Sequence, residues 1–241
     1  MPGGATIPAE TDLLCESCGY VLSGLPPGDD VRCPECGKPV AASDPARRKP
    51  AAWEARASLS SLLATSLHVL FRPTDFYRTL ATRGPTERAR RFASVHWWLA
   101  ALLFAVAADT HLRSFIAARK LRFPYNLLEL AAFTVVTYLF LAVTTRLAGW
   151  LTHWEASYRG YRLPRTVVER GMYYHAVHYL PVALVTALTV VGYAVAFSRG
   201  VAGVNSTVTY LYVLSAEVVL AALYLFWTYW IGMRNMMFAN A

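Results

Sequence analysis

The residues best suited to chemistry are four cysteines with the spacing C-x2-C-x14-C-x2-C. They are Cys15, Cys18, Cys33 and Cys36. Two-residue spacing lets both sulfurs of a pair converge on one cation, and two pairs complete the sulfur tetrahedron that zinc prefers. Four protein ligands leave no position for water, so the pattern predicts a structural Zn²⁺ site. Gly19 and Gly37 each follow the second cysteine of a pair, where a residue without a Cβ permits the turn.

Iron and disulfides stay open as alternatives for these cysteines. The segments "CESCGY" and "CPECGK" also resemble the iron-binding knuckles of rubredoxins, but rubredoxins have a longer, aromatic-rich gap. Here the gap contains one aromatic residue, Tyr20. The start "MPGGATIPAETDLL" has neither a basic nor an apolar segment, so we expect no cleaved signal peptide. The amino terminus would then stay in the cytosol, where thiols remain reduced.

Residues 13–38 are similar to the short zinc ribbons at the front of many bacterial proteins, which read CGY-x-L-x-GL followed by RCPECG. The matching residues are Cys18-Gly19-Tyr20, Leu22, Gly24-Leu25 and Arg32–Gly37. The resemblance implies a zinc ribbon without implying one particular function. So small a module has too little apolar surface to fold alone, and we expect the metal to supply much of its stability.

The rest of the chain is more apolar than a soluble protein. It is 56% hydrophobic and 16% charged overall, whereas about 25% of residues are charged in typical soluble domains. Crossing the hydrocarbon takes about 20 apolar residues. The predicted spans are residues 92–108, 123–145, 171–198 and 206–232. The expected fold class is therefore an all-α integral membrane helical bundle with four transmembrane helices and a small N-terminal zinc ribbon.

The sequence before the first span divides into four regions. They are a disordered N-terminus (1–12), the zinc ribbon (13–38), a linker rich in Pro, Ala and basic residues (39–52) and an amphipathic, interfacial helical region (53–91), followed by the transmembrane helical domain (92–241). Within "SLSSLLATSLHVLF" (58–71), a helix would place its apolar residues on one side and its polar residues on the other. The apolar face is expected to hold Leu59, Leu62, Leu63 and Leu70, with Leu67 and Val69 at its edges, and Ser61, Thr65 and His68 lie opposite. We expect this helix to lie along the membrane, with a re-entrant path or packing on the bundle left open.

The charge distribution predicts the orientation. The net charge is +8, and most Lys and Arg residues precede the first span. Positive charge accumulates on the cytosolic side, so both termini are expected in the cytosol, at the cytoplasmic membrane if the protein is bacterial. Because the cations flank apolar segments, we expect them to contact the lipid bilayer rather than nucleic acid.

Two segments resemble the Yip family of multi-spanning membrane proteins. They are "LFRPTDFYRTLATRG" (70–84), a proline-containing approach to the first span, and "TVVERGMYYHAVHYLPVAL" (166–184). The family usually has five spans, whereas four are predicted here, and its glycine pair before the third span is replaced by Arg159-Gly160-Tyr161. The resemblance implies a Yip-like multi-spanning helical domain. Eukaryotic members of the family interact with Rab-type GTPases, a role that we do not carry over to this chain.

Four polar residues within or beside the spans form a second candidate site. Glu217 is expected near mid-bilayer, where a carboxyl group is either functional or hydrogen-bonded between helices. Glu129 lies nearer a span end and is expected to be structural. His175 and His178 would share a helix face, a spacing that can bind metal, although an aromatic belt with the neighbouring tyrosines also explains them. A proton-linked pair of His178 and Glu217 is a further alternative.

The sequence contains no Walker loop, G-x-S-x-G, H-E-x-x-H or G-x-G-x-x-G motif, so we expect no enzyme. The predicted function is that of a scaffold or adaptor whose cytosolic zinc ribbon binds an unknown partner protein near the membrane. One alternative is a small transporter or proton-coupled permease using Glu217, which would need a homo-oligomer to enclose a pathway. Another is a redox membrane protein with iron in the ribbon.

Overall fold

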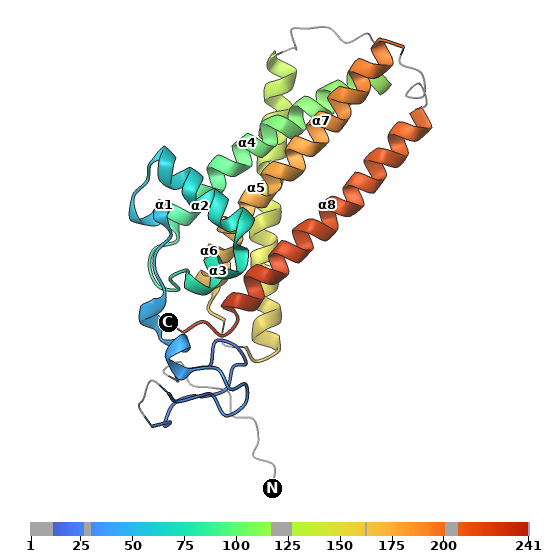
Figure 1. Cartoon of the computed structure of the whole chain (residues 1–241). Helices are drawn as coiled ribbons and strands as arrows, with labels where there is room; N and C mark the ends of the chain where they lie inside the picture. Colours follow the sequence, from blue (N-terminus) through green and yellow to red (C-terminus); the bar gives the residue numbers. More distant parts are fainter. Residues whose placement is uncertain (1–11, 27–29, 117–126, 162, 201–206, 241) are drawn as a thin grey trace. The chain divides into compact units, whose positions relative to one another are not determined.

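The computed structural model describes residues 12–26, 30–116, 127–161, 163–200 and 207–240 (Figure 1). Within these ranges the regular elements are helical, and β-pairing is limited to isolated bridges. The chain divides into two compact units. Unit 1 comprises Met1–Phe92, Arg146–His175 and Tyr229–Ala241, and unit 2 comprises Ala93–Thr145 and Ala176–Thr228.

The helices differ widely in length (Figure 1). The long ones are α4 (Glu87–His111), α5 (Leu127–Tyr158), α7 (Tyr179–Ser198) and α8 (Thr207–Met236). The shorter α-helices are α1 (Ala52–Ala55), α2 (Leu59–Phe71), α3 (Pro73–Thr79) and α6 (Arg165–His175). The remaining turns are the 3₁₀ segments η1 (Val40–Ser43), η2 (Pro45–Arg47) and η4 (Ala176–His178), and the π-helical η3 (Leu112–Ile116).

Four helical stretches are long and apolar enough to cross a membrane, as the sequence predicts. They are Glu87–Ser114, Leu127–Tyr158, Arg165–Ser198 and Val208–Met236. The expected span starts at 123 and 206 lie outside the described residues, as do residues 1–11 of the predicted disordered N-terminus. The first helix begins before the predicted span because Glu87 forms ion pairs with Arg90 and Arg91, and an acid in the first turn also favours the helix dipole.

The predicted span 171–198 is not one continuous α-helix. A 3₁₀ turn at Ala176–His178 separates α6, which belongs to unit 1, from α7, which belongs to unit 2. Pro181 explains the interruption, because it has no N–H to donate to the carbonyl of Val177 and its ring crowds that carbonyl.

Aromatic side chains form the core of unit 1. The ring of Tyr174 on α6 lies 5.0 Å from the ring of Phe76 on α3 and 5.0 Å from that of Phe92. Beside them, the guanidinium of Arg170, 2% exposed, donates to the carbonyls of Ala81 and Arg83 at 2.6 and 2.9 Å. This arginine therefore fixes the turn between α3 and α4 against α6.

Small residues allow close helix packing in unit 2. Ala107 on α4 and Ala187 on α7 are buried in one cluster with Val190 and with Tyr210 of α8. Alanines at such contacts let helix backbones approach closely, which is how helices associate when lipid removes the hydrophobic driving force.

Residues 39–52, which the sequence analysis treats as a linker, are ordered parts of unit 1. They contain η1, η2 and the start of α1. Lys49 pairs with the chain after α3: its amide donates to the carbonyl of Thr79 at 2.7 Å, and its carbonyl accepts from the amide of Ala81 at 2.9 Å. Arg48 is buried. The segment thus attaches the cysteine module to α3.

Candidate metal centre

The four cysteine sulfurs come together in one cluster. Cys15 and Cys36 lie 3.5 Å apart, Cys18 and Cys33 lie 3.6 Å apart, and all four ligand atoms lie within 4.8 Å of one another. A tetrahedral site with zinc–sulfur bonds of about 2.3 Å has sulfurs about 3.8 Å apart, whereas a disulfide bond needs about 2.05 Å. The cluster can therefore hold a metal ion with sulfurs near these positions.

Two matching knuckles position the sulfurs. In the first knuckle, the amide of Gly19 donates to the carbonyl of Cys15 at 2.8 Å. In the second, the amide of Gly37 donates to the carbonyl of Cys33 at 2.9 Å. Both glycines have positive φ, +80° and +70°, a conformation that costs other residues about 1–2 kcal/mol. The φ angles account physically for the glycine that follows each cysteine pair.

The protonation of the cysteines is uneven before any metal binds. Burial raises the pKa of the Cys18 thiol above its ordinary value. Burial acts in the same direction on Cys33, but the amides of Cys36 and Glu35 outweigh it and lower the pKa of the Cys33 thiol. Because hydrogen bonds to a thiolate favour its charged form, Cys33 is the cysteine of this group whose thiolate the surrounding amides favour, whereas the pKa of the Cys36 thiol on the same knuckle is raised.

The first knuckle is attached to the rest of unit 1 through Glu16, which stands between its two cysteines. The Glu16 carboxylate accepts from Nε and Nη2 of Arg48 at 2.8 and 2.9 Å. Arg48 Nη1 donates in turn to the carbonyls of Tyr77 and Leu80 at 3.2 and 2.9 Å. The amide of Glu16 also donates to Ser43 Oγ at 3.1 Å. One buried guanidinium therefore connects the first knuckle to α3.

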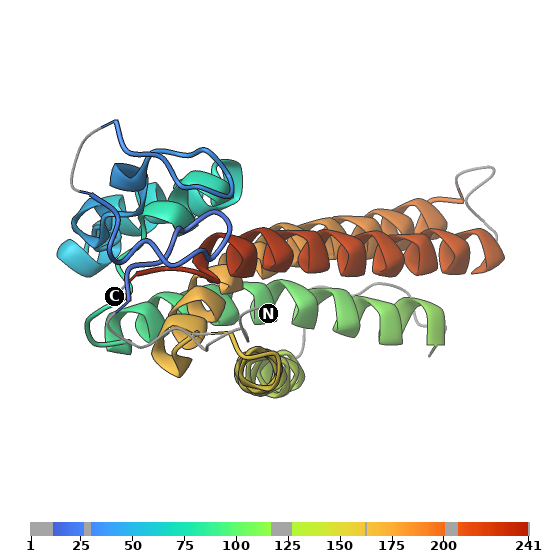
Figure 2. The same cartoon turned by 90° about the horizontal axis from the view of Figure 1, so that it is seen from below.

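The first knuckle is also attached to the segment after α8 through Asn240. The Asn240 side chain accepts from the amide of Leu14 and donates to the Leu14 carbonyl, both at 2.8 Å, and donates to the Ser43 carbonyl at 2.8 Å. The Asn240 carbonyl accepts from Thr82 Oγ1 at 2.9 Å. Figure 2 shows the segment after α8 reaching the module. Residues at the two ends of the chain thus build one site.

The second knuckle faces outward. Pro34, Glu35, Cys36 and Gly37 are exposed, whereas Cys15 and Cys33 are buried. The two knuckles have the same backbone turn but different surroundings. The first contacts the rest of unit 1, and the second has exposed side chains.

Glu217 lies on α8 within unit 2, and its Oε1 accepts from Thr186 Oγ1 of α7 at 2.5 Å. It borders a largely apolar hollow of about 330 Å³ between α7 and α8. The other lining residues are Pro181, Val182, Val185, Leu220, Ala221 and Tyr224. A carboxyl group hydrogen-bonded between two helices corresponds to the structural alternative of the sequence analysis, and its place beside a hollow keeps the functional alternative open.

The two candidate histidines make different contacts: His178 lies within hydrogen-bonding distance of a tyrosine hydroxyl, and His175 packs against a tyrosine ring. His178 is fully buried, and its Nδ1 lies 2.7 Å from the hydroxyl of Tyr224, which lines the same hollow as Glu217. The His175 ring packs edge-on against that of Tyr229, at 6.4 Å. Among the described residues, the four cysteines are the group of three or more ligand side chains that could hold a metal ion.

Glu129 belongs to a chain of ion pairs in unit 2. Arg113 donates through Nη2 to Glu129 Oε2 at 2.5 Å and through Nε to Asp109 Oδ1 at 2.8 Å. Asp109 is fully buried, so pairing with Arg113 offsets the cost of removing its charge from water. This arrangement gives Glu129 a structural role between α4 and α5.

Sequence reasoning missed the residues that attach the module. Arg48 lies in the basic triplet assigned to the linker, and Asn240 had no pattern to mark it. Glu16 offered the one available signal, because a carboxylate between two metal ligands is well placed to fix the module. No family model, curated protein or solved structure matches this chain.

Proposed function

We propose that this chain is a non-enzymatic integral membrane protein whose four cysteines hold a structural Zn²⁺ ion, and that its zinc ribbon is a fixed platform for a partner protein. The four long apolar helices support insertion in a bilayer. The distribution of Lys and Arg supports a cytosolic location for the ribbon and both termini. The two segments similar to the Yip family favour a multi-spanning scaffold.

The observation that carries the proposal is the difference between the two knuckles. Glu16 and Leu14 attach the first knuckle to Arg48 and Asn240, whereas Pro34 and Glu35 on the second knuckle are exposed. A site closed by four sulfurs offers no position for a reacting ligand, so its role is to hold shape. A rigid exposed knuckle is suited to recognition because little conformational entropy is lost on binding.

The test alters the outward surface and leaves the metal ligands in place. In the cells from which the protein comes, wild-type chain and a Pro34→Asp/Glu35→Arg variant are compared by proximity labelling and by zinc content. We expect the variant to keep its zinc and to lose one or more labelled partners. Cys33→Ser should lose both. Identical partner sets for the wild type and both variants would contradict the adaptor proposal.

A second candidate function is a transporter or proton-coupled permease. The hollow between α7 and α8 supports it, because Glu217 and Tyr224 both border that apolar space and the Tyr224 hydroxyl lies 2.7 Å from His178 Nδ1. The test is proton and solute flux into liposomes for wild type, Glu217→Gln and Thr186→Val. Flux that disappears in Glu217→Gln favours transport, whereas equal leakage from all three and from empty liposomes contradicts it.

A further inference from the structure

Helix α2 in unit 1 exposes its apolar side. Four side chains spaced four residues apart form what we call the outward stripe: Leu59, Leu63, Leu67 and Phe71, which are 73%, 55%, 54% and 76% exposed. Side chains at this spacing lie on one helix face. Isolated exposed leucines are ordinary on protein surfaces, but a continuous apolar stripe marks an interaction surface.

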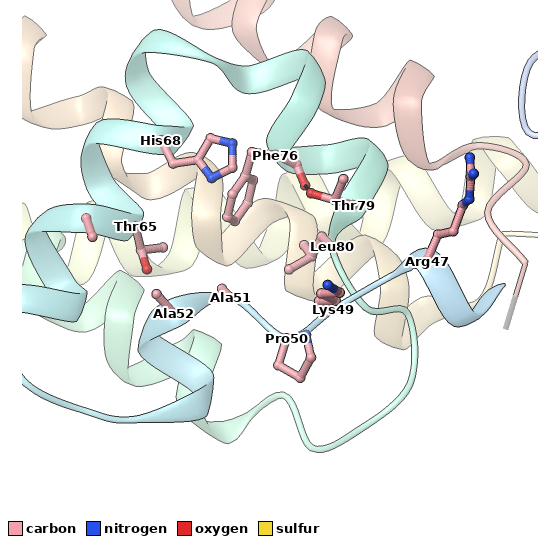
Figure 3. Close-up of a pocket in the computed structure, with 11 residues that line it drawn as sticks. Arg47, Lys49, Pro50, Ala51, Ala52, Thr65, His68, Phe76, Thr79 and Leu80 are labelled. Carbon is pink, nitrogen blue, oxygen red and sulfur yellow. Dashed lines mark hydrogen bonds between the residues drawn. The ribbon is translucent and has the colours of Figure 1, made fainter. Parts of the chain in front are cut away.

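The buried side of the same helix carries two hydroxyl side chains, Thr65 and Ser66, together with Val69. Thr65 is 2% exposed, and its Oγ1 accepts from the amide of Trp53 at 3.1 Å. Ser66 is also buried and donates to the carbonyl of Leu62 at 2.7 Å. Thr65 and His68 line a hollow of about 390 Å³ together with residues of α3 and of the segment before α1. Figure 3 shows these lining side chains. Helix α2 thus exposes its large apolar stripe and buries two hydroxyl side chains, whereas an amphipathic helix on a water-facing surface exposes its polar face.

Charged residues flank the outward stripe. Arg56 precedes α2 and Arg72 follows it, and both are exposed. A cation near an anionic leaflet contributes about 1 kcal/mol to membrane attachment. The helix therefore combines an apolar face with cations at both ends, as amphipathic helices at membrane interfaces do.

We propose that α2 lies on an anionic lipid surface, with the outward stripe among the acyl chains and Arg56 and Arg72 at the phosphate level. The inference rests on the proposed membrane location. It goes beyond that location by adding a lipid contact through a helix that is too short to span a bilayer. Residues 72–86, which include α3, connect α2 to α4, the first helix long enough to span, so α2 is tethered to a helix that would cross the bilayer.

A second copy of the chain is a less suitable occupant. Stable protein interfaces use roughly 20–30 residues on each side, and the outward face of α2 offers the four stripe residues with Ser60 and Ala64 between them. A lipid surface needs no such complementary area, because each buried CH₂ group contributes independently, about 0.8 kcal/mol.

The test uses the full chain in nanodiscs of phosphatidylcholine with or without phosphatidylglycerol. The photoreactive residue p-benzoylphenylalanine replaces Leu63 or Leu67, one at a time, and adducts are identified by mass spectrometry after illumination. The same residue at Val219, an exposed position on α8, is the matched control. We expect lipid adducts at all three positions.

The outcomes separate this inference from the proposed function. Lipid adducts at Val219 with none at Leu63 and Leu67, or with chain-to-chain adducts there, would overturn the placement of α2 while leaving the membrane location intact. Absence of lipid adducts at all three positions would overturn the membrane location, and this inference with it.

The charge contribution has its own measurement. Among the lipid adducts at Leu63, the share of phosphatidylglycerol should exceed its mole fraction in the nanodisc. In the Arg56→Gln/Arg72→Gln variant, this share should fall to the mole fraction. Adducts at Val219 should not change. An unchanged phosphatidylglycerol share at Leu63 in the double variant would contradict the role of the two arginines.

Discussion

Glu16 and Arg48 form a two-point ion pair, with Nε to Oε1 at 2.8 Å and Nη2 to Oε2 at 2.9 Å. Their side chains are 15% and 3% exposed. Parallel bonds between a guanidinium and a carboxylate are both strong and directional. The pair therefore determines where the cysteine module sits on unit 1, while the sulfurs determine the local fold of the module.

Replacing Arg48 should release the module from unit 1. Arg48→Met removes the guanidinium that donates to the Glu16 carboxylate and to two backbone carbonyls, a change that costs about 3 kcal/mol for a buried pair. A loss of about 3 kcal/mol corresponds to about a hundredfold change in an equilibrium constant. Amide hydrogen exchange of residues 12–50 in the full chain should therefore accelerate by that order.

A matched variant tests whether the pair is responsible. Arg32 is an exposed arginine of the module that donates to the Gly37 carbonyl. Arg32→Met should change exchange little, and Glu16→Gln/Arg48→Met should be less destabilised than Arg48→Met, because the unpaired charge is gone. Equal acceleration in Arg32→Met and Arg48→Met would show that the ion pair contributes nothing specific.

Metal content should be one zinc per chain, in a colourless preparation. Cys33→Ser removes a ligand whose thiolate is favoured by backbone amides, so zinc content should fall to near zero. The measurement is elemental analysis with an absorption spectrum of the purified chain. A red preparation containing iron would instead support the redox alternative.

The two knuckle glycines should differ when replaced by alanine. Both have positive φ, but a Cβ on Gly19 would lie 2.6 Å from Cε1 of Phe238, whereas a Cβ on Gly37 would meet nothing within 4 Å. Each variant carries the backbone cost of about 1–2 kcal/mol. Gly19→Ala should also displace Phe238, and so should release zinc faster than Gly37→Ala to a chromogenic chelator.

A second substitution checks the cause of the difference. In Gly19→Ala/Phe238→Leu the smaller side chain relieves the contact, and the rate of zinc release should approach that of Gly37→Ala. If the double variant releases zinc as fast as Gly19→Ala alone, the contact with Phe238 is not the cause.

Asn240→Asp should weaken the attachment of the first knuckle with almost no change in side-chain shape. The carboxylate cannot donate to the carbonyls of Leu14 and Ser43, and each buried acceptor left unpaired costs about 1–3 kcal/mol. Hydrogen exchange at the Leu14 amide should accelerate at least tenfold. Asn235→Asp on α8, where the side-chain oxygen accepts from Arg78, should leave that amide unchanged.

The parts of the structure that follow local rules could be predicted. Cysteine spacing brings four sulfurs together because the knuckle is a local turn. The long apolar segments form helices of the length that a bilayer would require, as their composition predicts. The attachment of the module could not be predicted: Asn240 contacts Leu14 across 226 positions of sequence, and no periodicity encodes such a pairing.

Helix α2 shows a different limit. Its periodicity separates a leucine face from a face with Thr65 and His68, yet amphipathicity alone does not say which face meets the protein. The structure places Thr65 inside because its hydroxyl accepts from the Trp53 amide. The direction of an amphipathic helix depends on tertiary hydrogen bonds, which the sequence pattern does not contain.

The contact between Leu14 and Asn240 also orders events during synthesis. A ribosome delivers residues 12–38 early, and their sulfurs can capture a cation from local turns alone. Asn240 is translated only after α4 to α8 have been made. The hydrogen bonds between Asn240 and Leu14 can therefore form only after translation has passed the final helix, whereas the ion pair of Glu16 and Arg48 can form earlier, so Asn240 completes an attachment that the ion pair begins.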